Sequence, residues 1–559
     1  MASLDPPCAQ PLNIRINLNT AELAHLEDKL RSEYGPFVVS PERAEELKEI
    51  LALADKDIED HDSEVARLQA IQANRQRLEI QRAKLRSLLS PMRKLSNEIL
   101  LHIFQYACKE NILQSYPWLS EQQPWTKLRS PVITYLPTMA ISSVCSRWRT
   151  LALSSPSLWA NLTVETHTAT LDQSKILLGF IDTVARYLER SGDWPLKIAL
   201  EIGGTPGPHH ETEIPSLNYL TQHACRWETF SYWGTYSLEN YEILSGLHFP
   251  LLTELCIFSV LDWEQTPDLD RFEYAPKLCA LTTTELATSK APYHQLRHLD
   301  LQYRNLELAE ILHRCPSVES LGFKNYEEEE EEDHTPDHGA HYTWRNITSL
   351  TFRTDDDDDV SYVERVFSSF DLPSLDVIVL DGCWRGAWPT ETFISFISRS
   401  SCMITTFTLH SISLSDSDFI AALRVMPSLL HLEIKDHKWD DEHVQTQRSS
   451  ITSRLISSLI QCESTSVCLV PKLHTLHLVS KLDTGAFDDS SFLSMIESRW
   501  FRPGSDLCAT MFAMGRHCIR SVVLKFGWRE VDPEVYKPLR ILDKEGLRVV
   551  VSGTNGIQV

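Results

Sequence analysis

The stretch that decides the fold is a short apolar pattern that recurs along the C-terminal part of the chain. It is clearest in Ile347-Thr348-Ser349-Leu350-Thr351-Phe352 and in Ile404-Thr405-Thr406-Phe407-Thr408-Leu409. Each copy has the form apolar-x-x-apolar-x-apolar, and its final alternation has the two-residue period of a half-buried strand. A weaker copy begins at Leu278, and ten full copies begin, in order, at Trp227, Leu252, Leu296, Val318, Ile347, Leu375, Ile404, Leu429, Leu473 and Ile519.

The spacing of these copies predicts a solenoid. From Leu296 onward, successive copies lie 22, 29, 28, 29, 25, 44 and 46 residues apart, and the last two intervals resemble a doubled or interrupted unit. The shorter intervals have the period of leucine-rich repeats, in which each unit adds one short parallel strand and a returning helix or loop. We therefore predict that residues 190–559 form an irregular leucine-rich-repeat solenoid with parallel strands lining one face.

The strands of such a solenoid present an extended concave binding surface. The x positions should face outward, and their mixed polar character suits a protein or peptide ligand: Thr348, Thr351, Thr405, Thr408, His431, Glu433, His474 and His477. Acidic runs at Glu327–Asp333 and Asp355–Asp359 are expected in loop insertions at 326–341 and 355–359, because like charges repel one another. They are either solvated insertions or patches that steer basic substrates.

The N-terminal part of the chain has a different pattern. Residues 1–39 are polar and are expected to be flexible, whereas Ser40-Pro41-Glu42 is a typical helix start. We expect a long helix over 40–90, ended by Ser90-Pro91. Arg75 and Arg82 interrupt its coiled-coil-like apolar stripe of Leu68, Ile71, Leu78, Leu85 and Leu89. This stripe packs either inside the chain or against a partner or dimer helix.

Residues 91–165 contain two short amphipathic segments. In the first, Ile99, Leu100, Ile103 and Phe104 fall on one helical face. The second begins with Val144-Cys145-Ser146-Arg147-Trp148, continues to Leu151, and is followed by Leu158-Trp159. The pattern alone is compatible with a helical hairpin that buries its own core.

The order of these residues resembles an F-box, whose usual form is Leu-Pro-x-Glu-Ile-Leu-x-x-Ile-Phe, then Val-Cys-x-x-Trp, then Leu-Trp. The matching residues are Leu95, Glu98, Ile99, Leu100, Ile103, Phe104, Val144, Cys145, Trp148, Leu158 and Trp159. F-boxes dock on the Skp adaptor of a cullin-RING ubiquitin ligase by burying apolar residues in a helical groove.

The resemblance therefore implies an adaptor-binding site made of the matching residues and Leu151. It implies that Leu95, Ile99, Ile103 and Phe104 are anchors. Val144, Trp148 and Trp159 either join these anchors or support the hairpin from behind.

Two features depart from the family pattern. Ser96 stands where the family usually has proline, and the interval from Phe104 to Val144 is longer than usual, with an insertion near 108–136. The insertion either shields the docking face or adds to it. The order of a leading helix, a Ser-Pro break and an F-box also resembles the large F-box families of mushroom-forming fungi.

Composition excludes several other classes of function. The chain has 53 Lys and Arg against 77 Asp and Glu, a net charge of −24 that disfavours nonspecific nucleic-acid binding. No secretory signal and no apolar run long enough to span a membrane is present. The 13 cysteines include no C-x-x-C pair, which favours reduced core thiols over disulfides or a zinc site.

The sequence contains no G-x-S-x-G, P-loop or H-E-x-x-H motif, so we expect no catalytic residues, no metal and no cofactor. The resemblance implies a cytoplasmic or nuclear adaptor, in which the F-box holds the Skp–cullin machinery and the repeats hold a protein target. The alternative is an interaction scaffold that uses the F-box or the N-terminal helix without directing ubiquitylation.

Overall fold

The structure is a computed structural model. It describes residues 14–15, 28, 30–31 and 40–557, apart from 116–135, 168–173, 204–213, 235–237, 239–241, 260–268, 285, 287–289, 304–310, 312, 326–340, 359–360, 385–387, 413, 437–448, 462–467, 482–486 and 503. The chain divides into two compact units, Met1–Leu100 and Leu101–Val559, and each is described by itself. Most of the segment 1–39 that was expected to be flexible lies outside the described residues.

The first unit contains the predicted long helix, α2 (Pro41–Leu88). The Ser40 hydroxyl accepts a hydrogen bond from the Arg43 N–H at 3.4 Å, and Pro41 occupies the first turn, where its missing N–H costs nothing. The apolar stripe of α2 is not packed inside the chain, because its members are between 51% and 82% exposed: Leu68, Ile71, Leu78, Leu85 and Leu89. After Ser90 follow a 3₁₀-helix, η1 (Pro91–Lys94), and α3 (Asn97–Ala107).

The second unit is built on one long sheet. Across the described residues, sixteen strands follow one another in sequence order, each parallel to the next except the antiparallel last pair. The strands are β1 (Asn111–Gln114), β2 (Asn161–His167), β3 (Leu196–Gly203), β4 (Trp227–Gly234), β5 (Glu254–Ser259), β6 (Ala280–Thr283), β7 (His298–Tyr303), β8 (Ser320–Asn325), β10 (Ser349–Asp358), β12 (Val377–Trp384), β13 (Thr406–His410), β14 (His431–Lys435), β15 (Thr475–Ser480), β16 (Ser521–Phe526), β17 (Arg548–Gly553) and β18 (Gly556–Ile557).

The repeated apolar residues stack in register through this sheet. In the central part, Leu350 lies beside Ile378, then Phe407, Leu432 and Leu476, and these side chains are at most 1% exposed. All ten full copies and the weaker copy at Leu278 fall on strands β4 to β16. The predicted α/β class with parallel strands is therefore confirmed, and the sheet is compatible with the predicted solenoid.

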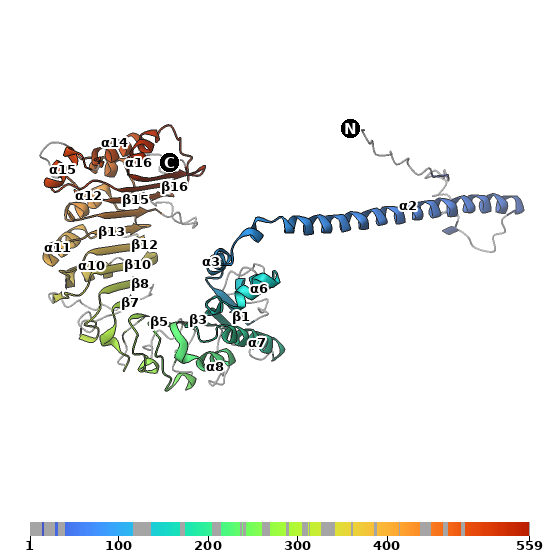
Figure 1. The fold of residues 1–559 in the computed structure, drawn as a ribbon, viewed down its shortest axis with the longest axis horizontal. Helices are drawn as coiled ribbons and strands as arrows, with labels where there is room; N and C mark the ends of the chain where they lie inside the picture. Colours follow the sequence, from blue (N-terminus) through green and yellow to red (C-terminus); the bar gives the residue numbers. More distant parts are fainter. Residues whose placement is uncertain are drawn as a thin grey trace. The chain divides into compact units, whose positions relative to one another are not determined.

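Helices return the chain between many of the strands and cover one side of the sheet (Figure 1). Their caps are local: the side chains of Ser415, Thr452 and Ser505 each accept a hydrogen bond from the backbone N–H three residues on. The principal helices of the second unit are α5 (Pro137–Ser142), α6 (Ser146–Leu153), α7 (Ser174–Arg190), α8 (Pro215–Thr221), α10 (Ser361–Ser369), α11 (Thr390–Ser400), α12 (Asp416–Arg424), α13 (Ser453–Ser458), α14 (Asp489–Arg499), α15 (Asp506–Ala513) and α16 (Lys537–Lys544).

Arginines join successive repeats through backbone carbonyl groups. The guanidinium of Arg399, near the end of α11, donates to the carbonyls of Phe367 and Phe370 in the preceding repeat at 2.7 and 3.1 Å. Arg499 is placed in the same way at the end of α14, and its side chain is fully buried. Its three nitrogens donate to the carbonyls of Leu459, Leu469 and Val470 at 2.6, 2.7 and 3.0 Å.

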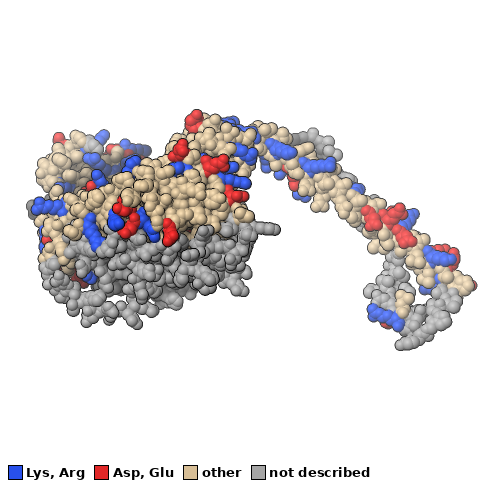
Figure 2. All heavy atoms as spheres, turned by 90° about the horizontal axis from the view of Figure 1, so that it is seen from below, with Lys and Arg blue, Asp and Glu red and all other residues tan. Residues whose placement is uncertain are grey.

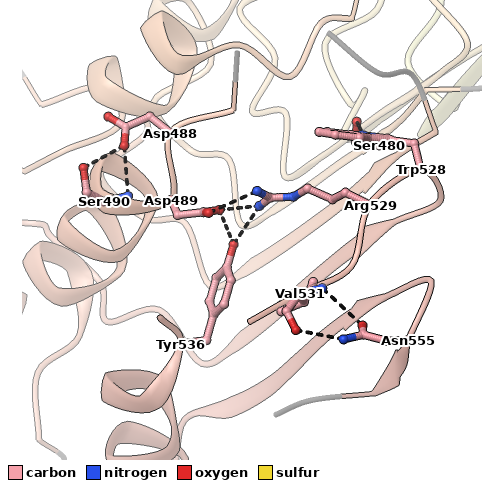
Figure 3. Close-up of polar contacts among 9 residues, drawn as sticks. All are labelled: Ser480, Asp488, Asp489, Ser490, Trp528, Arg529, Val531, Tyr536 and Asn555. Carbon is pink, nitrogen blue, oxygen red and sulfur yellow. Dashed lines mark hydrogen bonds and ion pairs between the residues drawn. The ribbon is translucent and has the colours of Figure 1, made fainter. Parts of the chain in front are cut away.

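A polar network closes the C-terminal end of the sheet (Figure 3). Arg529 binds the carboxylate of Asp489, which also accepts a hydrogen bond from the Tyr536 hydroxyl. The Asn555 side chain pairs with both backbone groups of Val531, at 3.1 and 3.0 Å. The network ties α14 and the turn after β17 to the segment between β16 and α16.

Two expected boundaries are corrected by the structure. The sheet begins at β1 and β2, which lie within the segment 91–165 assigned to the F-box, so the parallel sheet starts well before residue 190. The acidic run from Asp355 to Asp358 continues strand β10 instead of forming a loop, with a register irregularity after Thr354. The other acidic insertion, 326–341, lies almost entirely outside the described residues.

Candidate partner-docking surfaces

Helix α3 is the first candidate docking element. Its start is set by Ser96, whose backbone carbonyl accepts a hydrogen bond from the Leu100 N–H at 3.1 Å. The Ser96 hydroxyl also binds the Glu98 carboxylate, and this hydrogen bond lowers the pKa of Glu98. Serine thus supplies a helix start where the F-box pattern usually has proline.

The apolar side chains of α3 divide between two faces. Leu100 and Phe104, four residues apart, have no exposed surface and belong to the core. Ile99 and Ile103 form an outward stripe with Tyr106, and they are 49%, 41% and 77% exposed. Spacings of four and three residues place the three side chains on one face of the helix. This outward apolar stripe of α3 (Ile99, Ile103 and Tyr106) is a surface that an apolar partner groove would cover.

The second segment of the motif supports α3 from inside the second unit. The Phe104 ring meets the half-buried Trp148 ring edge to face, with centroids 4.9 Å apart. The indole N–H of the fully buried Trp159 donates to the Ala152 carbonyl at 2.8 Å, and the Arg190 guanidinium lies 4.5 Å from its ring centroid. Trp159 therefore links the hairpin to α7 and is not available as an anchor.

The matched residues occupy three environments. Leu100, Phe104, Leu158 and Trp159 are buried; Leu95, Trp148 and Leu151 are half-buried; and Glu98, Ile99, Ile103, Val144 and Cys145 are exposed. Phe104 was expected as an anchor, but here it is a core side chain that positions the helix. Tyr106 was missed by the sequence analysis, although its spacing of three residues from Ile103 was sufficient to find it.

The face of the sheet opposite the helices is the second candidate surface, called here the open face. The residues between the buried ladder positions point toward it, among them Thr351, Thr408, Glu433 and His477, all of which are half-buried. The sequence analysis had assigned these residues to an outward surface, and the parallel register brings them side by side.

A charged cluster occupies the open face over β12 to β15. The two nitrogens of His410 lie 3.6 Å from an Asp381 oxygen and 3.2 Å from a Glu433 oxygen. The hydrogen bond to Asp381 raises the pKa of His410, and the same contact lowers the pKa of Asp381. Lys435 and His477 also contact Glu433, and burial lowers the pKa of His477. The cluster is therefore a set of mutually neutralised side chains suited to polar contacts with a protein segment.

A second ion pair on the open face depends on a glycine. Arg353 on β10 reaches Asp300 on β7, with the guanidinium nitrogen 3.1 Å from the carboxylate oxygen. The strand between them, β8, places Gly322 beneath the pair, and a Cβ there would lie 1.7 Å from the Asp300 oxygen. The open face thus carries paired acidic and basic side chains both over β7 to β10 and over β12 to β15.

The described residues contain no group of three or more His, Cys, Asp or Glu side chains that could hold a metal ion. In the same residues, no helix combines the length and apolarity needed to cross a bilayer. No protein-family model matches the chain, and no curated protein matches it either.

Proposed function

We propose that this chain is a non-catalytic substrate-recognition subunit of a Skp–cullin–F-box type ubiquitin ligase. In this proposal the outward stripe of α3 docks on a Skp-type adaptor, and the open face of the sheet binds a protein target. The observation that carries the proposal is the exposure of Ile99 and Ile103 on a helix whose sequence matches the F-box pattern.

The two isoleucines supply a physical reason for docking. Full burial of an aliphatic side chain of this size contributes about 1.5–3 kcal/mol relative to leaving it exposed. Apolar anchors near the centre of an interface carry most of its binding energy. An adaptor groove that covers Ile99 and Ile103 would therefore gain affinity from side chains that are already fixed on a helix, with little ordering cost.

The open face supports the second half of the proposal. A parallel solenoid exposes an extended set of strand side chains, which suits recognition of a protein segment more than of a small molecule. Tethering a bound target beside the ligase raises its effective concentration at the transferase. Ubiquitin transfer would then need no bond-making chemistry from this chain.

Affinity purification of the full chain followed by mass spectrometry tests the proposal. We expect a Skp-type adaptor and a cullin to co-purify with the native chain, and to be lost from an Ile99→Asp, Ile103→Asp variant. Leu178→Asp is the matched control, because Leu178 is also an exposed apolar residue on a helix, 64% exposed on α7. Equal recovery of the adaptor with both variants would exclude docking through α3.

A second candidate function is an interaction scaffold that does not direct ubiquitylation. The exposed apolar stripe of α2 favours it, since this helix offers a binding surface independent of α3. Recovery of protein partners without a cullin would support the scaffold over the ligase subunit.

A further inference from the structure

The charges of α2 are strongly segregated along its length. Residues 41–64 contain ten acidic and three basic side chains, a net charge of 3 − 10 = −7. Residues 65–88 contain one acidic and six basic side chains, a net charge of 6 − 1 = +5. Figure 2 shows the acidic side chains gathered toward the Pro41 end of the extended helix and basic ones spread along the other half.

The exposed stripe follows a coiled-coil heptad. If Leu68 occupies position a, Ile71, Leu78 and Leu85 occupy successive d positions, and Leu89 occupies a further a position. Arg75 and Arg82 fall at the a positions between them, and Glu64 and Asp57 fall at d positions nearer the start of the helix. The a and d positions form the contact line of a coiled coil, called here the seam. Its basic interruptions lie in the C-terminal half of α2, and its acidic interruptions lie nearer the start of the helix.

We propose that α2 pairs with α2 of a second copy of this chain in an antiparallel coiled coil. In an antiparallel pair, each a residue faces a d residue of the other helix. Placing Leu68 opposite Ile71 of the second copy sets Arg75 opposite Glu64 and Arg82 opposite Asp57. Leu89 then faces Ile50, so every charged a residue between the ends meets an opposite charge.

The alternative arrangements lose these pairings. A parallel, in-register dimer sets Arg75 against Arg75 and Glu64 against Glu64, and like charges at a seam are destabilising. Sliding the antiparallel pair by one heptad in either direction places one of the two arginines, Arg75 or Arg82, opposite an isoleucine. The chosen register overlaps residues 50–89, which at 1.5 Å per residue spans roughly 60 Å of helix.

The existing contacts of these charges are compatible with pairing. Arg75 contacts Glu79, and Glu64 contacts Arg67, through exposed pairs on the surface of the same helix. Such pairs contribute little to stability, and although Arg67 binds both oxygens of Glu64, at 2.7 and 2.6 Å, each oxygen can accept a further hydrogen bond from across an interface. Asp57 is buried, with both its oxygens bound by Arg15, and Ile50, Ala54 and His61 beside it on the seam are half-buried, so the second copy would have to replace these contacts. The Arg75–Glu64 pair is therefore the cleaner test.

Analytical ultracentrifugation of the full chain tests the dimer. The native chain should sediment as a dimer of the 64.0 kDa protomer at micromolar concentration, and added salt should weaken it. Arg75→Glu should raise the dimer dissociation constant at least about tenfold, because the symmetric dimer contains the changed contact twice. Arg77→Glu is the matched control: it makes the same charge change at a position off the seam, and it should have a much smaller effect.

A compensating variant determines the orientation. Arg75→Glu combined with Glu64→Arg restores an opposite pair only in the antiparallel dimer, so we expect dimerisation to recover. A native chain that stays monomeric at tens of micromolar would overturn the proposal, as would equal weakening by Arg77→Glu. Failure of the double variant to recover, with its helix content intact by circular dichroism, would exclude the antiparallel register. None of these results depends on adaptor binding through α3.

Discussion

The buried guanidinium of Arg499 gives the sharpest prediction about what holds the repeats together. Replacing Arg499 with methionine keeps most of the side-chain volume but removes every donor. The carbonyls of Leu459, Leu469 and Val470 would then lose the guanidinium as a donor, although Leu469 keeps the Cys468 thiol at 3.6 Å and Val470 keeps the Leu473 N–H at 3.3 Å. We expect the C-terminal repeats to open more easily, because these three groups hold the preceding repeat against α14.

The magnitude follows from two opposing contributions. Three hydrogen bonds to a charged group are worth about 4.5–9 kcal/mol together, at about 1.5–3 kcal/mol each. Burial lowers the pKa of Arg499, which shows that burying its charge offsets part of this gain. Arg499→Met should therefore reduce the free energy of local opening by less than the full sum, by about 2–6 kcal/mol.

Hydrogen–deuterium exchange of peptides from β15 and β16 measures this opening directly, because stability in a repeat array is local. Arg424→Met is the matched control, since Arg424 also ends a helix, α12, but is exposed. Exchange at β15 and β16 that rises no more in Arg499→Met than in Arg424→Met would refute the idea that the arginine contacts stabilise the repeats.

Three further changes have defined outcomes. Burial raises the pKa of Asp436 from 3.8 to about 6, so the free energy of unfolding falls by up to about 3 kcal/mol as pH rises from about 4 through 6. Asp436→Asn should therefore raise Tm more at pH 8 than at pH 4. An equal Tm shift at both pH values would contradict this. Gly322→Ala should push Asp300 away from Arg353 and lower the free energy of unfolding by less than about 1 kcal/mol. In an Asp300→Ala background, the same substitution should cause no further loss of stability in thermal denaturation. Trp159→Phe removes the hydrogen bond to Ala152 and should destabilise the hairpin by about 1–2 kcal/mol; unchanged proteolytic protection of α6 would count against it.

The repeat strands were predictable because their signal is local and repeated. The apolar pattern located β4 to β16, and the parallel ladder then follows from stacking equivalent positions. Strand β2 carries the same spacing in Trp159, Leu162 and Val164, but Trp159 was assigned only to the F-box pattern. Trp159 therefore belongs both to the F-box pattern and to the apolar repeat pattern of strand β2.

Strand β1 was not predictable from an apolar template. Asn111 occupies the ladder position beside Leu162, and it is fully buried. Its side chain is satisfied there by donating to the carbonyls of Leu158 and Asn161, both at 3.1 Å, and by accepting from the Tyr187 hydroxyl. A buried asparagine is stable when its hydrogen bonds are made, but those partners are far away in the sequence.

Only part of the candidate site could be predicted, because contacts with residues distant in the sequence decide which side chains of α3 face outward. Helix α3 has apolar residues around much of its circumference, so the pattern identified the helix without deciding which residues face inward. The Phe104 contact with Trp148 decides that, and it turns Ile99 and Ile103 outward. The apolar stripe of α2 was ambiguous for the opposite reason, because only the structure shows that it is exposed.

Isothermal titration calorimetry of the purified full chain with a purified Skp-type adaptor tests the central proposal most directly. We predict one-to-one binding with a dissociation constant of about 1 μM or tighter, and at least a tenfold loss of affinity for a folded Ile103→Asp variant. Leu178→Asp should bind as tightly as the native chain. The absence of binding, or equal affinity of the Ile103→Asp variant, would contradict the assignment of α3 as the docking helix.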